Sequence, residues 1–219
     1  MKVLSLAALA FLSQSVSAHY IWNNLIYGSG STRAAIRMPV SNSPVENVSS
    51  LDIRCNANPG QASETVSVAA GSTIGFDLDN TIYHQGPAAM YLGKAPGSVA
   101  SWDGSGNAWF KIAEWGATFN PFQFTDYNLN RLTTTIPANT PPGEYLVRIE
   151  QVGLHVAGAP QFYISCAQIK VTGNGSGNPA KVAIPGSGYA TAGDPGLTVN
   201  IYYPIPTSYT VPGPRPWRG

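Results

Sequence analysis

Short runs of β-branched and aromatic residues recur along the chain, each bounded by Gly, Pro or Asn. Such runs have the length and spacing of strands in an antiparallel β-sandwich. No segment after residue 18 shows helical periodicity over three turns, so we expect an all-β fold of the immunoglobulin-like or fibronectin-like kind. The clearest predicted strands are residues 65–68, 73–78, 145–150, 162–171 and 198–202.

The segments between these runs indicate one domain over residues 19–219. Residues 102–130 are rich in Gly, Asn and aromatic residues, and we expect a long loop of the kind that often carries function. Residues 173–177 resemble a linker, but too little chain follows them for a second domain. We therefore expect the remainder, up to Trp217, to wrap back over the sandwich.

The first eighteen residues read as a secretory signal peptide. Lys2 supplies a positive start, residues 3–12 an apolar stretch, and Val16-Ser17-Ala18 a small-residue cleavage site. The apolar run is too short for a transmembrane span, and no later stretch approaches about twenty apolar residues. We expect a soluble, secreted, extracellular protein without a membrane partner, whose new N-terminus after cleavage is His19.

Charged residues make up only 11% of the chain, against roughly 25% in ordinary globular proteins. Without Lys2 the chain carries 11 basic and 11 acidic residues and is formally neutral. Nucleic-acid binding needs clustered Lys and Arg, so this balance argues against it. It fits an uncharged partner such as a neutral polysaccharide.

Two cysteines, Cys55 and Cys166, remain in a chain that we expect to be exported. An even count in an oxidising compartment predicts a disulfide, which over so long a loop contributes about 4–5 kcal/mol in the chain-entropy model. A thiolate metal pair is the alternative, but the chain lacks CxxC spacing. Sequons at Asn47 and Asn174 predict N-glycosylation.

The chain contains three histidines: His19, His84 and His155. An N-terminal histidine offers its imidazole and its α-amine, which titrates near pH ~8 and loses its proton to a metal at small cost. His84 follows a strand-like run, so a turn would present it at a sheet end. Three nitrogens in a plane suit copper, whereas zinc prefers a tetrahedral set. The alternative is that cleavage falls before a histidine by chance.

The strand predicted around Cys166 adds polar candidates. Alternation places Phe162 and Cys166 on one face, which suits a core and a disulfide. Gln161 and Tyr163 share the opposite face, and His155 lies shortly upstream. These side chains can line a polar metal pocket; an ordinary half-buried strand with hydrogen-bonded polar residues is the alternative.

Four segments together resemble a known family. The mature start His19-Tyr20, Tyr83-His-Gln-Gly-Pro87, Leu154-His155 with Gln161-Phe-Tyr-Ile-Ser-Cys-Ala-Gln168, and the tail Asn200-Ile-Tyr-Tyr with Tyr209 and Pro212-Gly-Pro214 carry the likeness. They resemble the fungal cellulose-active lytic polysaccharide monooxygenases, auxiliary activity family nine, once classed as glycoside hydrolase family sixty-one. The resemblance covers essentially the whole mature chain.

The resemblance implies a site for one copper ion, called a histidine brace. His19 would bind through its α-amine and imidazole, His84 through its imidazole, and Tyr163 would occupy the distant axial position. His155 and Gln161 would form hydrogen bonds to the oxygen co-substrate, so that these two and Tyr163 are the candidate catalytic residues.

The resemblance also implies a Cys55–Cys166 disulfide and a flat face of long loops that rests on the polysaccharide. Tyr209 would lie on that face, and Tyr20 or Tyr27 would join it. The implied partners are cellulose or a related β-glucan, a small reductant or an electron-donating redox enzyme, and O2 or H2O2. We expect a monomer without a carbohydrate-binding module, and oxidation at C1 in preference to C4.

One departure from the family pattern lies between His155 and Gln161. The intervening Val-Ala-Gly-Ala-Pro is shorter than the usual form and has Pro160 where a second glycine-alanine step is common. This difference can shift His155 or Gln161 slightly, but it leaves the copper ligands intact.

Three other functions compete with this interpretation. A hydrolytic glycosidase needs two carboxylates flanking the bond, and the sparse acids here, such as Asp103 and Glu114, share no motif. A carbohydrate-binding module has no need of a processed N-terminal histidine. A secreted copper-binding or copper-delivery protein would share the brace without the flat face or the His155–Gln161 pair.

Overall fold

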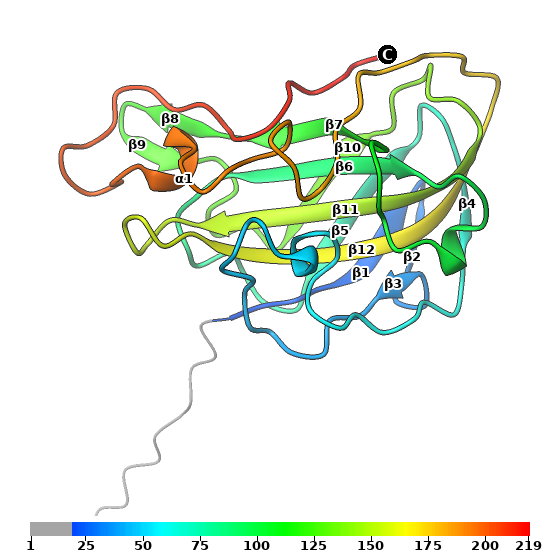
Figure 1. The fold of residues 1–219 in the computed structure, drawn as a ribbon, viewed down its shortest axis with the longest axis horizontal. Helices are drawn as coiled ribbons and strands as arrows, with labels where there is room; N and C mark the ends of the chain where they lie inside the picture. The colour runs from blue at the N-terminus through cyan, green and yellow to red at the C-terminus, as the bar shows by residue number, and fades with distance from the viewer. Residues whose placement is uncertain (1–18) are drawn as a thin grey trace, which may run out of the picture.

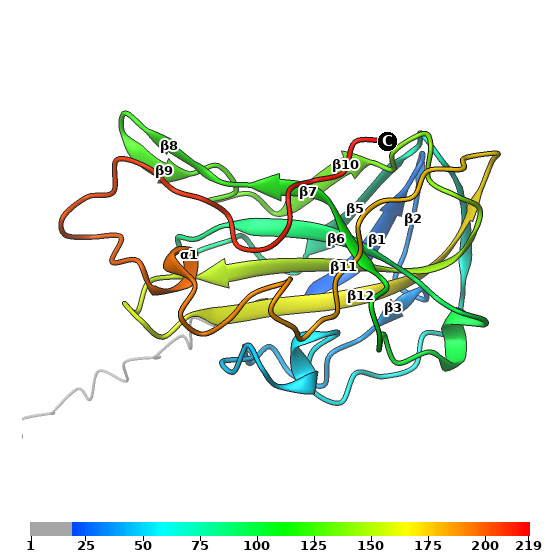
Figure 2. The ribbon, with the colours of Figure 1, turned by 45° about the horizontal axis from the view of Figure 1, so that its top comes forward.

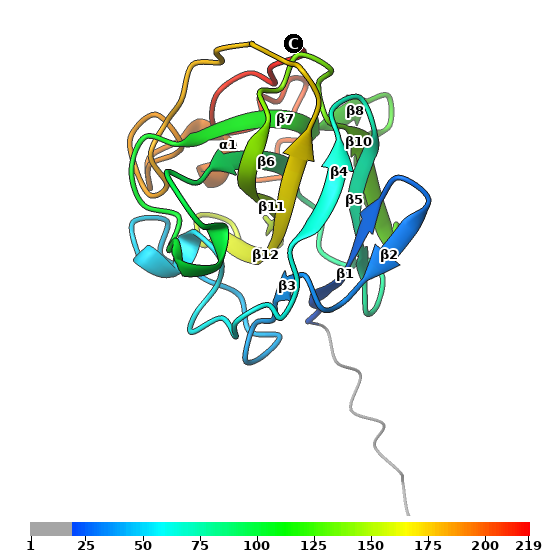
Figure 3. The same ribbon diagram turned by 90° about the vertical axis from the view of Figure 1, so that its right-hand side faces the viewer.

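The computed structural model describes residues 19–219, so the predicted signal peptide lies outside the described residues. Two β-sheets pack face to face, and Figure 3 shows the two layers side by side. The smaller sheet has the strand order β10-β5-β1-β2. Its strands are β1 Trp22–Tyr27, β2 Gly30–Thr32, β5 Thr73–Leu78 and β10 Arg131–Thr135.

The larger sheet has six strands, in the order β3-β12-β11-β6-β7 with β4 also paired to β12. The pairs are antiparallel except β4–β12, which is parallel; a parallel pair needs a long connection, and about a hundred residues separate these strands. The predicted all-β antiparallel sandwich is confirmed. The strands are β3 Ile36–Arg37, β4 Val66–Ala69, β6 Ala88–Lys94, β7 Trp109–Trp115, β11 Gly143–Gly153 and β12 Gln161–Thr172.

The remaining elements are short and lie outside the two sheets. They are the hairpin of β8 Ala117–Phe119 and β9 Phe122–Phe124, the 3-10 turns η1 Leu51–Ile53 and η2 Val99–Ser101, and α1 Pro195–Thr198. None of the helices within residues 19–219 is long and apolar enough to cross a membrane.

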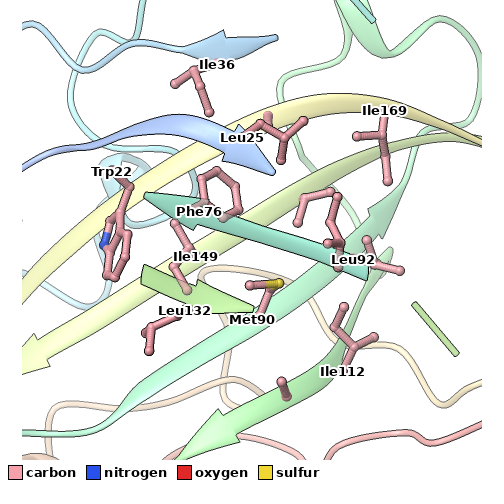
Figure 4. Close-up of a cluster of buried hydrophobic side chains, with 14 of the residues drawn as sticks. Trp22, Leu25, Ile36, Phe76, Met90, Leu92, Ile112, Leu132, Ile149 and Ile169 are labelled. Atoms are coloured by element: carbon pink, nitrogen blue, oxygen red, sulfur yellow. The ribbon is translucent and has the colours of Figure 1, made fainter. Parts of the chain in front are cut away.

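The main core fills the space between the sheets (Figure 4). Phe76 from β5 and Leu25 from β1 face Met90 from β6 and Ile149 from β11, and all four are fully buried. The predicted alternation in β12 is confirmed, because Tyr163 belongs to this core whereas Phe162 packs on the other face of the sheet.

The outer face of the larger sheet is also buried, because loops and the C-terminal segment cover it. The Cys55–Cys166 disulfide joins the η1 loop to this face. The tail wraps over the sandwich as predicted: Tyr189 and Leu197 pack in the cluster on this outer face, and the Trp217 amide donates to the Lys111 carbonyl of β7. The sheet that carries the site is therefore enclosed on both sides.

Two predictions about local structure are wrong. Residues 102–130 form no long loop but contain β7, β8 and β9. Because β7 is buried on both faces, it lacks the polar–apolar alternation that marks a half-exposed strand. Residues 198–202 form no strand; Pro195 starts a short helix capped by Asp194, and the Asn200 side chain then accepts from the amides of Tyr202 and Tyr203 in a turn.

The strand register brings four chain segments to one end of the sandwich. Gly153 at the end of β11 pairs with Gln161 at the start of β12, and Gln151 pairs with Ala88 at the start of β6. Trp22 at the start of β1 is aligned with the end of β5. The β11–β12 connection, α1 and the β8–β9 hairpin extend at this end, on the left in Figures 1 and 2.

Candidate metal centre

The side chains of His19, His84 and Tyr163 converge at this end of the sandwich. His19 precedes β1, His84 lies in the β5–β6 connection, and Tyr163 is the third residue of β12. The two imidazole centroids are 6.2 Å apart, and the phenol centroid lies 5.9 Å from His19 and 5.6 Å from His84. The structure therefore brings the three predicted ligands together from three segments.

The loop that carries His84 is docked against the end of β11. The carbonyls of Gln85 and Pro87 accept hydrogen bonds from the amides of Leu154 and Val152, each at 2.8 Å. Gly86 lies between them with a φ of 157°, and a Cβ built there would lie 1.7 Å from the Val152 carbonyl oxygen. Only glycine allows so close an approach of the two backbones, so Gly86 fixes where His84 stands.

His19 is placed by its two neighbours in the fold. The Asn42 amide donates to the His19 carbonyl at 3.4 Å. The next residue, Tyr20, is 2% exposed, and its ring packs 4.3 Å from Tyr163 and 5.9 Å from His84. His19 therefore enters the site from a backbone held by buried contacts.

His155 lies beside the pair of imidazoles. Its ring stacks on His84 with centroids 3.8 Å apart. A Cβ at Gly153 would lie 3.1 Å from His84 Cβ and 3.1 Å from His155 Nδ1, so glycine leaves room for this stack. Burial, and then the nearby charge of His19, lower the pKa of His155. The structure therefore favours a neutral imidazole at this position.

Gln161 lies against the hydroxyl of Tyr163. The phenol donates to Gln161 Oε1 at 3.0 Å, and Gln161 Nε2 donates to Glu46 Oε1 at 3.4 Å. Burial, and then the negative charge of Glu46, raise the pKa of Tyr163. The phenol thus stays protonated and neutral, and it holds the orientation of the Gln161 amide.

The donor set fits a copper ion. Two imidazoles that share one ion at metal–nitrogen distances of about 2 Å have ring centres roughly 6 Å apart, close to the separation of His19 and His84. Within residues 19–219 no group of three or more His, Cys, Asp or Glu side chains is arranged for a metal. A site of two imidazoles, a terminal amine and a phenol does not need such a group, and nitrogen-rich tetragonal coordination suits copper(II).

Two of the three predicted surface tyrosines lie elsewhere. Tyr20 is buried and donates its hydroxyl to Gln151, so its assignment to the substrate face is wrong. Tyr27 ends β1, a full strand length from His19, and packs against the main core, so its assignment is also wrong. Tyr209 is half-buried against Phe124 and donates to a backbone carbonyl; its substrate role stays a prediction.

Two aromatic residues exposed near the site are not among the residues predicted from the sequence. Tyr202 and Tyr203 are 60% and 82% exposed, and the Tyr202 hydroxyl donates to the His155 carbonyl at 3.3 Å. Pro204 and Pro206 follow these two tyrosines and disfavour a strand, which places both rings on a loop.

Gln151 is also not among the site residues predicted from the sequence. It lies between Glu150 and Val152 near the end of β11 and is fully buried, and a buried polar residue of this kind needs defined partners. The asparagines of both sequons, Asn47 and Asn174, are exposed, and their glycosylation stays a prediction.

Comparison with known proteins gives consistent matches over nearly the whole chain. The family model for Auxiliary Activity family 9 (formerly GH61) matches residues 16–209. The chain is 48% identical over 233 aligned positions to an AA9 family lytic polysaccharide monooxygenase H of Malbranchea cinnamomea, covering 100% of both chains. It is 50% identical to such an enzyme, E, of Podospora anserina, covering 97% of this chain and 73% of that one.

A solved structure agrees with this match. The crystal structure of a cellulose-active polysaccharide monooxygenase from M. thermophila superposes with a TM-score of 0.79 at 33% identity, over 92% of this chain and 100% of that one.

Proposed function

Because the chain belongs to Auxiliary Activity family 9, the lytic polysaccharide monooxygenases, we propose that it cleaves β-1,4-glucan chains such as cellulose by copper-dependent oxidation. The co-substrates would be O2 or H2O2 together with a reductant. The observation that carries the proposal is the convergence of His19, His84 and Tyr163, with His155 and Gln161 beside them. The predicted leader and the disulfide support a secreted enzyme.

The copper ligands would be the imidazoles of His19 and His84 and the α-amine of His19, with the phenol of Tyr163 facing both rings. The amine exists only after the bond between Ala18 and His19 is cleaved. A reducible copper ion with an open position supplies the oxidising power that hydrogen abstraction from a sugar C–H bond requires.

The neighbouring side chains provide hydrogen bonds and a proton. Tyr163 donates to Gln161 Oε1 and Glu46 accepts one hydrogen of Gln161 Nε2, so the second Nε2 hydrogen is available to donate toward a co-substrate. His155 Nδ1 is buried, and no hydrogen-bond partner for it exists among residues 19–219. A neutral imidazole held in this way can accept and return a proton beside His84.

Exposed apolar rings beside the site support a flat polysaccharide as the substrate. Tyr202, Tyr203 and Ile205 are all at least 60% exposed in the loop that contacts His155. Tyrosine offers a broad apolar ring and a polar tip, which suits a glucan face that is apolar between its hydroxyls. The sparse charge of the chain matches an uncharged ligand.

The decisive experiment incubates copper-loaded mature protein, beginning at His19, with swollen cellulose, ascorbate and H2O2. Mass spectrometry should detect oxidised oligosaccharides, and we expect aldonic acids in excess over 4-keto sugars. The matched controls are the metal-free protein and His84→Ala, both of which should give none. Absence of oxidised products from protein verified to hold copper would refute the proposal.

A further inference from the structure

One buried amide connects the two chain segments that carry His19 and His84. Gln151 lies near the end of β11 and is 0% exposed. Its Oε1 accepts from the hydroxyl of Tyr20 at 2.5 Å, and its Nε2 donates to the carbonyl of His84 at 3.0 Å. Because Tyr20 directly follows His19, a single side chain spans both halves of the site.

The orientation of this amide is determined by its partners. Nε2 also donates to the Val152 carbonyl at 3.3 Å, and carbonyl oxygens can only accept. The nitrogen of Gln151 must therefore face the two carbonyls, which leaves its oxygen toward the phenol. Tyr20 must then be the donor.

The ring of Tyr20 extends this connection toward the ligands. It packs 4.3 Å from the ring of Tyr163 and 5.9 Å from that of His84. Tyr20 and Gln151 are both buried, so water cannot replace a lost partner and the remaining group would stay unsatisfied. These buried contacts therefore resist movement of His19 away from His84.

We propose that Gln151 and Tyr20 are positioning residues that set the separation of His19 and His84, and thereby the copper affinity and coordination geometry of the site. The inference rests on the proposed function, since it assumes that both histidines bind copper. Neither residue contacts the metal in this role; each acts through the backbone or ring of a ligand. A purely structural hydrogen bond would stabilise the fold without changing the metal's properties.

Gln168 provides the matched control. It is another buried glutamine, 2% exposed, on β12, where it accepts from Arg37 and donates to the Glu64 carbonyl. Gln168 lies seven residues along the strand from Gln161, so at about 3.3 Å per residue it is more than 20 Å from the site. Gln168→Leu therefore removes a comparable buried amide from the same sheet.

The test compares the mature wild-type protein with Gln151→Leu, Tyr20→Phe and Gln168→Leu. Copper(II) dissociation constants come from calorimetry, coordination geometry from electron paramagnetic resonance, and fold stability from the melting temperature of the metal-free protein. We expect Gln151→Leu to raise the dissociation constant about tenfold and to change the copper spectrum. Tyr20→Phe should act in the same direction by about fivefold, and Gln168→Leu should lower only the melting temperature.

The other outcomes distinguish failure of the positioning role from failure of the proposed function. Wild-type affinity and spectrum in both Gln151→Leu and Tyr20→Phe would overturn the positioning role and leave the proposed function standing. An equal loss of affinity in Gln168→Leu would also overturn it, because the effect would then be general destabilisation. Failure of the wild type to bind copper would refute the proposed function and the inference with it. If Gln151→Leu does not fold, Tyr20→Phe, which keeps the ring, decides the question.

Discussion

The imidazole of His155 lies flat against that of His84, with ring planes 14° apart. His155 therefore stands at the edge of the proposed metal centre without being one of its ligands. We predict that His155→Ala leaves the copper dissociation constant within about threefold of wild type. Formation of oxidised sugars should fall by about 10²-fold or more, because a positioned proton donor or acceptor typically contributes that much.

Calorimetry and product analysis on the same His155→Ala sample distinguish a polysaccharide monooxygenase from a copper-delivery protein. A copper-delivery protein would have no oxidation to lose. Parallel loss of copper binding and oxidation would instead make His155 a ligand and contradict the assignment.

Retaining one residue before His19 should abolish the terminal chelate. In a chain that begins acetyl-Gly-His19, the nitrogen of His19 is a peptide nitrogen and no free amine remains beside the imidazole to form the chelate. We predict a copper dissociation constant about 100-fold or more above that of the mature protein, measured by calorimetry after intact-mass verification of both termini. Equal affinity of the two forms would show that the brace assignment is wrong.

Truncation of the exposed tyrosines should weaken adsorption to cellulose and spare the metal centre. Tyr202→Ala/Tyr203→Ala removes two rings that contribute apolar contact with a flat glucan, and we predict about tenfold weaker binding in a pull-down isotherm. The copper spectrum should remain that of wild type. The control is Leu51→Ala, which removes a 64% exposed side chain from η1; a comparable loss of adsorption there would argue against a localised face.

Removal of the disulfide should cost stability rather than metal binding. Cys55 and Cys166 are 111 residues apart, and breaking a native bridge of this kind typically costs about 2–5 kcal/mol of unfolding free energy. Urea denaturation of Cys55→Ala/Cys166→Ala measures this loss. Copper affinity of the folded fraction should stay within about threefold, since the hydrogen bonds of Asn42 to the His19 carbonyl and of Gln151 to the His84 carbonyl remain.

Asp126 should make the fold less stable as the pH rises. Its side chain is 0% exposed, and neither carboxyl oxygen has a hydrogen-bond partner in the described part of the chain. Burial raises the pKa of Asp126 well above its usual value. At a pH below about 3.9 both folded and unfolded chains are protonated there; above it the unfolded chain ionises first, which costs stability at about 1.4 kcal/mol per pH unit until the folded pKa is passed.

The variant Asp126→Asn cannot ionise, so it tests this sign directly. The unfolding free energy of Asp126→Asn minus that of wild type should become more positive from pH 4 to pH 8, as measured by urea denaturation at each pH. The exposed Asp52→Asn serves as the control. A difference between Asp126→Asn and wild type that does not change with pH would contradict the expectation.

Elements with a clear pattern could be predicted from the sequence. The strand β5 was predicted at its observed bounds, and β12 within one residue at each end, because their apolar positions alternate between Gly- and Pro-rich turns. The strand β7 was missed because both of its faces are buried, and the second cover, supplied by the C-terminal segment, is a tertiary feature. Local sequence carries no sign of such a cover.

The residues of the site also differ in whether the sequence predicts them. His19 and His84 could be predicted because the chain has few histidines and one follows a cleavage motif. The burial of Tyr20 could not, since a tyrosine next to a metal ligand reads the same whether its ring faces solvent or the core. The role of Gln151 depends on a contact across 131 residues to Tyr20, which only the folded chain reveals.

The closeness of Gly86 to the Val152 carbonyl also bears on how this protein can be engineered. Gly86 tolerates no added side chain at the point where the loop meets β11, so any substitution there would displace the backbone that carries His84. The surface loop of residues 202–205 bears no such constraint on its exposed rings. Mutational libraries that seek new substrates should therefore diversify that loop and leave the His84 segment unchanged.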